Sequence, residues 1–167
     1  MLRAAALARV FVVANDPAPW AALGIEVVPD LVGGLGPLGG IHAALTAADE
    51  CDAVVCVAGD LPFVAPALLA ALRDRAPWAD AVAARSARGA EPLCARYGRT
   101  MKPIIDGRVR AGDLAVHELL ERRSVDWIEG ADLLALDPTG GSFFNVNTPE
   151  DLARAEEIAA AAVERRP

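Results

Sequence analysis

Polar side chains follow three apolar segments of this sequence, close to the point where each segment would end as a strand. Asn15, Asp30 and Asp60 each lie within two residues of such an end. Because ligands of open α/β sheets bind at the carboxyl ends of the strands, all three side chains are candidate ligand contacts. A carboxylate in that place can hold Mg²⁺, which binds through one or two carboxylates together with substrate phosphates.

Both carboxylates also have purely structural explanations. Asp60 is explained equally well as the cap of a helix that begins near Pro66. Asp30 is somewhat better explained as an Asx-turn residue that opens the following loop. Position alone therefore leaves both readings of Asp60 open and slightly favours a structural role for Asp30.

Residues 33–40 contain five glycines and precede an expected helix. Residues 34–39 fit the GxGxxG dinucleotide fingerprint, but that fingerprint should open a helix directly after its strand, and Pro37 lies inside it. The more general expectation is that Gly36, Gly39 and Gly40 let the backbone approach a ligand closely, beside free N–H groups at the helix start. The alternative is a flexible surface loop.

Asn145 and Asn147 are two residues apart in a segment that we expect to be extended, so their side chains share one side. They can bind a polar ligand, although hydrogen bonds to their own loop explain the spacing better. The three cysteines form no CxxC pair and none lies beside a histidine in sequence, which predicts structural thiols without a disulfide framework or zinc site. We expect both histidines, His42 and His117, to be ordinary helix residues.

Short apolar runs alternate with helical patterns along the whole chain, which predicts one α/β domain over residues 1–167. The expected architecture is three-layered, with a mostly parallel sheet, helices on both faces, and residues 53–58 as a central strand because they are continuously apolar. The last helix should begin at Thr148 and Pro149. The expected strands are 10–14, 25–28, 53–58, 79–84, 92–97 and 125–128, and the expected helices are 2–8, 40–49, 66–75, 99–106, 113–122 and 149–165.

The overall charge and hydropathy exclude several classes of protein. A net charge of −7 and a pI of about 4.8 argue against a nucleic-acid-binding surface, which needs a positive footprint. No apolar run approaches the ~20 residues that span a bilayer, and the first residues do not read as a signal peptide. We therefore expect a cytoplasmic protein that binds neither nucleic acid nor membrane.

Taken together, the motifs resemble those of the molybdenum cofactor guanylyltransferases, a family of α/β nucleotidyltransferases. The resemblance runs from about residue 9 to about residue 160, and its order and spacing are specific although each motif alone is weak. The segments that carry it are Asp30, GPLGGI at 36–41, GDLPFV at 59–64, EPL at 91–93 and NVNTPEDL at 145–152.

This resemblance implies Mg²⁺-dependent transfer of GMP from GTP to the phosphate of molybdopterin, with release of pyrophosphate. It also implies GTP and molybdopterin (the molybdenum cofactor) as partners, and transient contact with other proteins of cofactor biosynthesis or molybdoenzyme maturation. The resemblance implies that Asp60 binds Mg²⁺ and takes part in catalysis. It implies nucleotide contacts for Asp30, Asp60 and Asn15, where the alignment of Asn15 with the family can shift by two residues. Gly36, Gly39 and Gly40 would line the guanine pocket, and Asn145 and Asn147 would contact molybdopterin.

One departure from the family concerns the N-terminus. The family begins with a strand and a loop of the form LAGGxSxRMGxDK that wraps the triphosphate, and residues 2–8 here resemble the end of the helix that follows this loop. We therefore expect an N-terminally truncated domain that is a poor enzyme as written. The alternatives are a non-catalytic nucleotide-binding or partner protein of the same fold, and a related cytidylyltransferase or an enzyme that builds another cofactor.

Overall fold

The computed structural model describes residues 7–164, which are built around a four-stranded mixed sheet. Its strands are β3 (Ala53–Val57), β4 (Ala81–Ser86), β5 (Gly89–Gly98) and β6 (Val125–Ile128). The spatial order is β3-β5-β4-β6, with β5 antiparallel to both of its neighbours and β6 parallel to β4. The predicted α/β class is confirmed, with one reversed strand because β4 and β5 form a hairpin.

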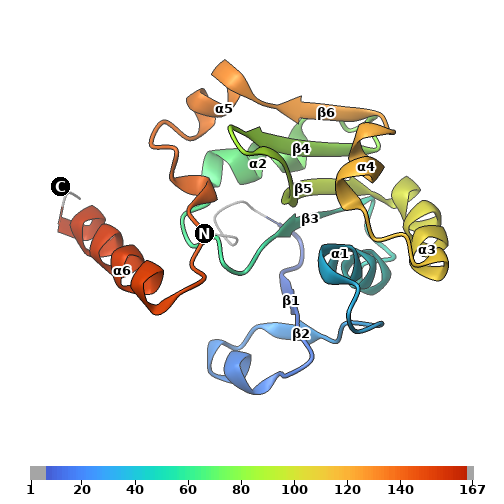
Figure 1. Ribbon diagram of the computed structural model, residues 1–167, viewed down its shortest axis with the longest axis horizontal. Helices are drawn as coiled ribbons and strands as arrows, with labels where there is room; N and C mark the ends of the chain where they lie inside the picture. The colour runs from blue at the N-terminus through green and yellow to red at the C-terminus, as the bar shows by residue number, and fades with distance from the viewer. Residues whose placement is uncertain (1–6, 165–167) are drawn as a thin grey trace.

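Helices cover both faces of this sheet (Figure 1). One face carries α1 (Gly36–Ala47), α3 (Lys102–Ala111) and α4 (Val116–Glu121), and the other carries α2 (Pro66–Asp74) and α5 (Gly130–Leu136). Successive strand residues point to opposite faces, so Ala83 packs in the cluster under α1 and α3 while Val82 packs in the cluster under α2. The predicted three-layer arrangement follows from this alternation.

A second, two-stranded parallel sheet lies beside the first and consists of β1 (Phe11–Val13) and β2 (Glu26–Val28), joined through the 3-10 helix η2 (Ala18–Leu23). Among the residues that the structure describes, β1 pairs only with β2, and β3 pairs only with β5. The prediction that residues 53–58 form a central strand is therefore wrong. Residues 53–58 are continuously apolar because helices cover both faces of β3. Val54 faces the cluster under α1, while Val55 and Val57 face the cluster under α2.

The glycine-rich segment is more helical than its composition predicts. Helix α1 begins at Gly36 rather than at residue 40, with Gly36 at a φ of +57° and Pro37 in the first turn. Proline fits there because its missing N–H would have no intrahelical partner. The predicted helix at 2–8 falls mostly on residues outside the described range, and residues 7 and 8 are not helical. Helix α5 was not predicted.

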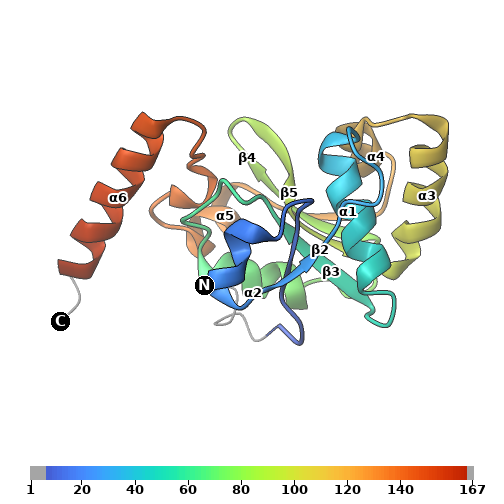
Figure 2. The ribbon, with the colours of Figure 1, turned by 90° about the horizontal axis from the view of Figure 1, so that it is seen from below.

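The last helix, α6 (Pro149–Glu164), begins where the sequence predicts. The Thr148 hydroxyl accepts a hydrogen bond from the Asp151 N–H at 3.1 Å, and the Asp151 carboxylate accepts one from the Thr148 N–H at 3.0 Å. The helix projects from the body in both views (Figures 1 and 2), and Leu152 is 51 % exposed while Ala155 is buried. In the described part of the chain, no helix is long and apolar enough to cross a bilayer.

Candidate active site

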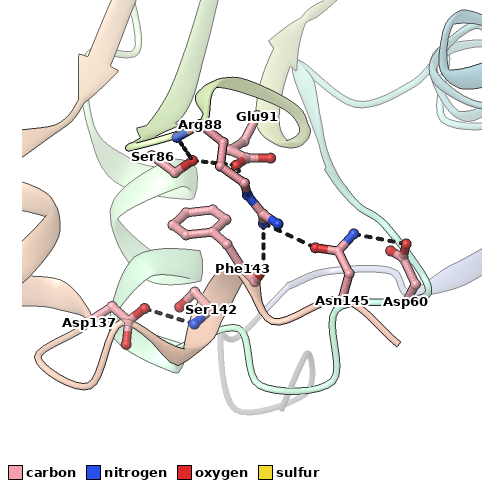
Figure 3. Close-up of polar contacts among 8 residues, drawn as sticks. All are labelled: Asp60, Ser86, Arg88, Glu91, Asp137, Ser142, Phe143 and Asn145. Carbon is pink, nitrogen blue, oxygen red and sulfur yellow. Dashed lines mark hydrogen bonds and ion pairs between the residues drawn. The ribbon is translucent and has the colours of Figure 1, made fainter. Parts of the chain in front are cut away.

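Asp60 lies just beyond the end of β3 and is fastened to a segment 85 residues further along the chain (Figure 3). Its Oδ2 accepts a hydrogen bond from Asn145 Nδ2 at 3.1 Å, and its main-chain carbonyl accepts one from the Val146 N–H at 2.9 Å. Its other carboxylate oxygen, Oδ1, is buried and has no hydrogen-bond partner among the described residues. A buried carboxylate oxygen without a partner is costly, so it marks a place for a donor or a cation.

The capping explanation of Asp60 is wrong. Helix α2 has Ala65 as its N-cap residue and no side-chain cap, and the Ala65 N–H instead donates to the Ser142 hydroxyl at 3.0 Å. Asp60 is therefore not needed to begin α2, and its carboxylate is free for another role. The expectation that Asn145 hydrogen-bonds to its own loop is also wrong. Its side chain bonds to Asp60 and to Arg88 instead.

Asn15, Asp30 and Gly39 form a second group, where the ends of β1 and β2 meet the first turns of α1. Asn15 Oδ1 accepts a hydrogen bond from the Asp30 N–H at 3.0 Å. The Asp30 carboxylate accepts one from the Val32 N–H at 3.2 Å, which is the expected Asx turn. A methyl group on Gly39 would lie 3.2 and 3.3 Å from the two Asp30 carboxylate oxygens. Gly39 therefore lets α1 approach Asp30 closely.

We predict that Gly39→Ala and Gly40→Ala have opposite effects on stability. The Gly39 methyl would also lie 3.0 Å from the Leu35 Cβ, and overpacking of this kind costs about 1–3 kcal/mol. A methyl on Gly40 meets no atom of the described residues within 4 Å, so Gly40→Ala should stabilise helix α1 by up to about 1 kcal/mol. Urea unfolding of both variants measures the difference, and equal free energies of unfolding would contradict the close approach at Gly39.

The predicted site residues thus form two groups rather than one. A cavity of about 630 Å³ is lined by residues of β1 and β3 and reaches both Gly40 in α1 and Gly59 next to Asp60. Asn147 belongs to neither group: its side chain is exposed, and its N–H donates to the Asp151 carboxylate at 3.1 Å, which supports the start of α6.

The tip of the β4–β5 hairpin also reaches this site, although its residues were not predicted as site residues. The Arg88 guanidinium donates to the Phe143 carbonyl at 2.5 Å and to Asn145 Oδ1 at 3.1 Å. Ser86 holds the tip, since its hydroxyl accepts from the Arg88 N–H at 3.0 Å and donates to Glu91 at 2.6 Å. The feature of the sequence that could have indicated this role is the polar turn directly before the EPL motif.

The EPL motif itself forms an irregularity in β5. The pairing of β5 with β4 shifts between Ala83 and Ala84, so Pro92 is not paired with a residue of β4. The Leu93 carbonyl accepts a hydrogen bond from the Ala58 N–H at 2.8 Å, just before Asp60. The bulge therefore helps to fix the end of β3, from which the Asp60 carboxylate projects.

A turn with two buried ends, Asp137 and Ser142, precedes the segment that carries Asn145. Asp137 Oδ2 accepts from the Ser142 N–H at 2.8 Å, and Oδ1 accepts from the Thr139 hydroxyl at 3.0 Å. Burial by itself would raise the pKa of Asp137, but the hydrogen bonds from Ser142 and Thr139 outweigh it, so the pKa is lowered. Asp137 therefore remains a charged anchor for the segment that carries Asn145.

The remaining candidates for chemistry are structural. Burial raises the pKa values of the Cys56 and Cys94 thiols to about 12, so neither is a thiolate at neutral pH. His42 Nε2 lies 2.9 Å from Asp106 Oδ1 and joins α1 to α3. Within residues 7–164, no three His, Cys, Asp or Glu side chains gather as a ready-made metal site. A divalent cation at Asp60 would therefore need oxygens from a substrate as well.

Comparisons with known proteins agree on one family. The model of the MobA-like NTP transferase domain matches residues 1–126. The chain is 37 % identical over 137 residues to a probable molybdenum cofactor guanylyltransferase of Pelotomaculum thermopropionicum, covering 82 % of this chain and 66 % of that protein. It is 37 % identical over 140 residues to the molybdenum cofactor guanylyltransferase of Rhodobacter capsulatus, covering 81 % and 67 %. The chain thus spans about two thirds of the length of these relatives.

A solved structure shows the same fold. The molybdopterin-guanine dinucleotide biosynthesis protein A from Archaeoglobus fulgidus superposes with a TM-score of 0.73 at 33 % sequence identity. The match covers 89 % of this chain and 77 % of the other. The similarity therefore extends over most of this chain.

Proposed function

Because the chain belongs to the MobA-like NTP transferase family, we propose that it transfers GMP from GTP to molybdopterin, forming the guanine dinucleotide form of the cofactor. The observation that carries this proposal is the Asp60 carboxylate: Asn145 holds one of its oxygens, and the other is buried without a hydrogen-bond partner in the described part of the chain. The named relatives support the choice of nucleotide and acceptor.

In this reaction, an oxygen of the molybdopterin phosphate attacks the α-phosphorus of GTP. The new P–O bond joins the two phosphates, while the bond from the α-phosphorus to the bridging oxygen breaks and its electron pair leaves with pyrophosphate. No protein nucleophile is required, which agrees with the buried thiols of Cys56 and Cys94. The chain's task is to position the two substrates and to balance their charge.

Asp60 fits the binding of Mg²⁺, since a hard cation prefers carboxylate oxygens and no residue between 7 and 164 bonds to the Asp60 Oδ1. When bound, Mg²⁺ neutralises phosphate charge and orients the phosphates for in-line displacement. Asn145 keeps the carboxylate in place by donating to its Oδ2. We assign Asn15, Asp30 and the Gly36–Gly40 turn to the nucleotide, because a helix start offers free N–H groups to an anionic or polar ligand.

The proposal is tested by a transfer assay with molybdopterin and labelled nucleotides. We expect Mg²⁺-dependent formation of the guanine dinucleotide from GTP and much slower reaction with CTP. Faster transfer from CTP would assign a cytidylyltransferase instead. Tight binding of GTP without transfer, in this chain and in an N-terminally extended one, would support the non-catalytic alternative.

We assign Asn145 and Asn147 to the molybdopterin side, and Asn147 gives the cleaner test because Asn145 also holds Asp60. Asn147→Ala should raise the KM for molybdopterin roughly tenfold, equivalent to one lost hydrogen bond, with little change for GTP. Steady-state kinetics with each substrate varied in turn measure this change. Asn15→Ala is the comparison variant, for which we expect the larger rise in KM with GTP. A larger GTP effect in Asn147→Ala would reverse the assignment.

A further inference from the structure

A phosphate acceptor next to Asp60 brings negative charge into an acidic protein, so the site needs a compensating cation on the acceptor side. The net charge of the chain is −7, and its only lysine is Lys102. Lys102 lies in α3 and pairs with Asp106 at 3.4 Å. A side-chain cation that binds the acceptor phosphate near Asp60 is therefore expected to be an arginine.

Arg88 is connected to Asp60 through a single side chain (Figure 3). Its guanidinium donates to Asn145 Oδ1 at 3.1 Å, and Asn145 Nδ2 donates to Asp60 Oδ2 at 3.1 Å. The Asn145 amide thus separates a cation from the carboxylate. An anion bound by Arg88 would lie next to Asp60 without displacing the Asn145–Asp60 hydrogen bond.

The position of Arg88 is fixed by its backbone, while its side chain stays accessible. Ser86 bonds to the Arg88 N–H, and Gly89, at a φ of +119°, completes the tight hairpin turn. Yet 61 % of the Arg88 side chain is exposed, and its carboxylate neighbour Glu91 is 4.0 Å away. A guanidinium held in this way has N–H donors left for an incoming phosphate, whose geometry the planar fork matches.

Arg88 also lines a cavity of about 780 Å³, whose wall includes Leu133, Leu134 and Phe143. Arg85 lines the same cavity, but its guanidinium is already neutralised. It pairs with Glu121 at 3.1 Å and Glu129 at 3.4 Å, and it stacks 3.9 Å from the centre of the Trp127 ring. Of the two arginines, only Arg88 faces both the cavity and Asn145.

We propose that Arg88 binds the phosphate of the acceptor substrate and holds it beside Asp60, with the organic part of the acceptor over the Leu133–Phe143 cavity. The proposal rests on the function proposed above and adds a residue that determines acceptor binding. On acceptor binding, the phosphate oxygens accept from the guanidinium donors that do not already bond to the Phe143 carbonyl and Asn145.

The test compares Arg88→Gln, Arg88→Lys and the control Arg122→Gln, which removes the same charge from an exposed arginine outside the cavity, where it pairs with Glu118 at 3.7 Å. In the transfer assay, Arg88→Gln should raise the KM for molybdopterin about 10- to 100-fold and change the KM for GTP less than about twofold. Arg88→Lys should recover part of the loss, and Arg122→Gln should stay near the wild type. Thermal melting of each variant confirms that it is folded.

Direct binding of molybdopterin, followed by calorimetry, separates this inference from the proposed function. If the wild type binds molybdopterin but transfers no GMP, the proposed function fails. In that case, weaker molybdopterin binding by Arg88→Gln, with unchanged binding by the control variant, still supports the role of Arg88. Equal losses in Arg88→Gln and Arg122→Gln would overturn the inference. So would an equal rise in the KM for GTP, because Arg88 would then act through Asn145 and Asp60.

Discussion

Replacing Asp60 with asparagine is expected to lower the rate of GMP transfer roughly a thousandfold, since preorganised stabilisation of transition-state charge is usually the largest catalytic term. The change keeps the size of the side chain, and its carbonyl oxygen can still accept from Asn145 Nδ2. It removes the negative charge at the buried Oδ1 position, which is the part that fits a cation. Single-turnover assays in an N-terminally extended chain measure the loss without interference from substrate affinity.

Calorimetry of GTP binding with and without Mg²⁺ tests whether the lower rate of Asp60→Asn comes from the loss of Mg²⁺ binding. Binding by the wild type should strengthen with Mg²⁺, whereas binding by Asp60→Asn should respond little. Asp74→Asn is a suitable control, because Asp74 is an exposed carboxylate of α2 that pairs with Arg73. Equal Mg²⁺-dependent binding by the wild type and Asp60→Asn would remove Asp60 from its assigned role.

An N-terminal extension is expected to give the second large effect, raising both stability and activity. The 630 Å³ cavity lies between β1 and β3, whose facing edges are unpaired among the described residues. An extended apolar strand placed there would pair with both edges and bury residues such as Phe11 and Val55. A net gain of about 3 kcal/mol would raise the melting temperature by roughly 10 °C and reduce edge-to-edge aggregation.

The extension to test carries an apolar strand, a glycine-rich loop with a lysine, and a helical segment, all placed before residue 1. Its loop would supply N–H donors and a positive charge to the triphosphate, so GMP transfer should rise at least a hundredfold. An extension of equal length with a proline in the middle of the strand is the control, because proline cannot complete the ladder. Equal melting temperatures and rates for the 167-residue chain and its extended form would contradict the role of the cavity and the proposed mechanism.

Several features of this protein follow from the sequence by itself. The alternation of apolar runs and helical patterns predicts the α/β class, and the start of α6 follows from Thr148 and Pro149, because capping depends on neighbouring residues. The place of Asp60 just after a strand is equally local. The close order of the motifs also indicates the family, which the comparisons confirm.

Only the tertiary structure decided how these parts meet. The bond between Asp60 and Asn145 joins residues 85 positions apart, and Arg88 enters the same network from a hairpin that reads as a plain polar turn. The edge position of β3 was likewise not predictable, because a continuously apolar strand is expected wherever helices cover both faces, whether or not strands pair with both of its edges. Strand order and side-chain partners depend on the path of the whole chain, and local patterns do not contain that path.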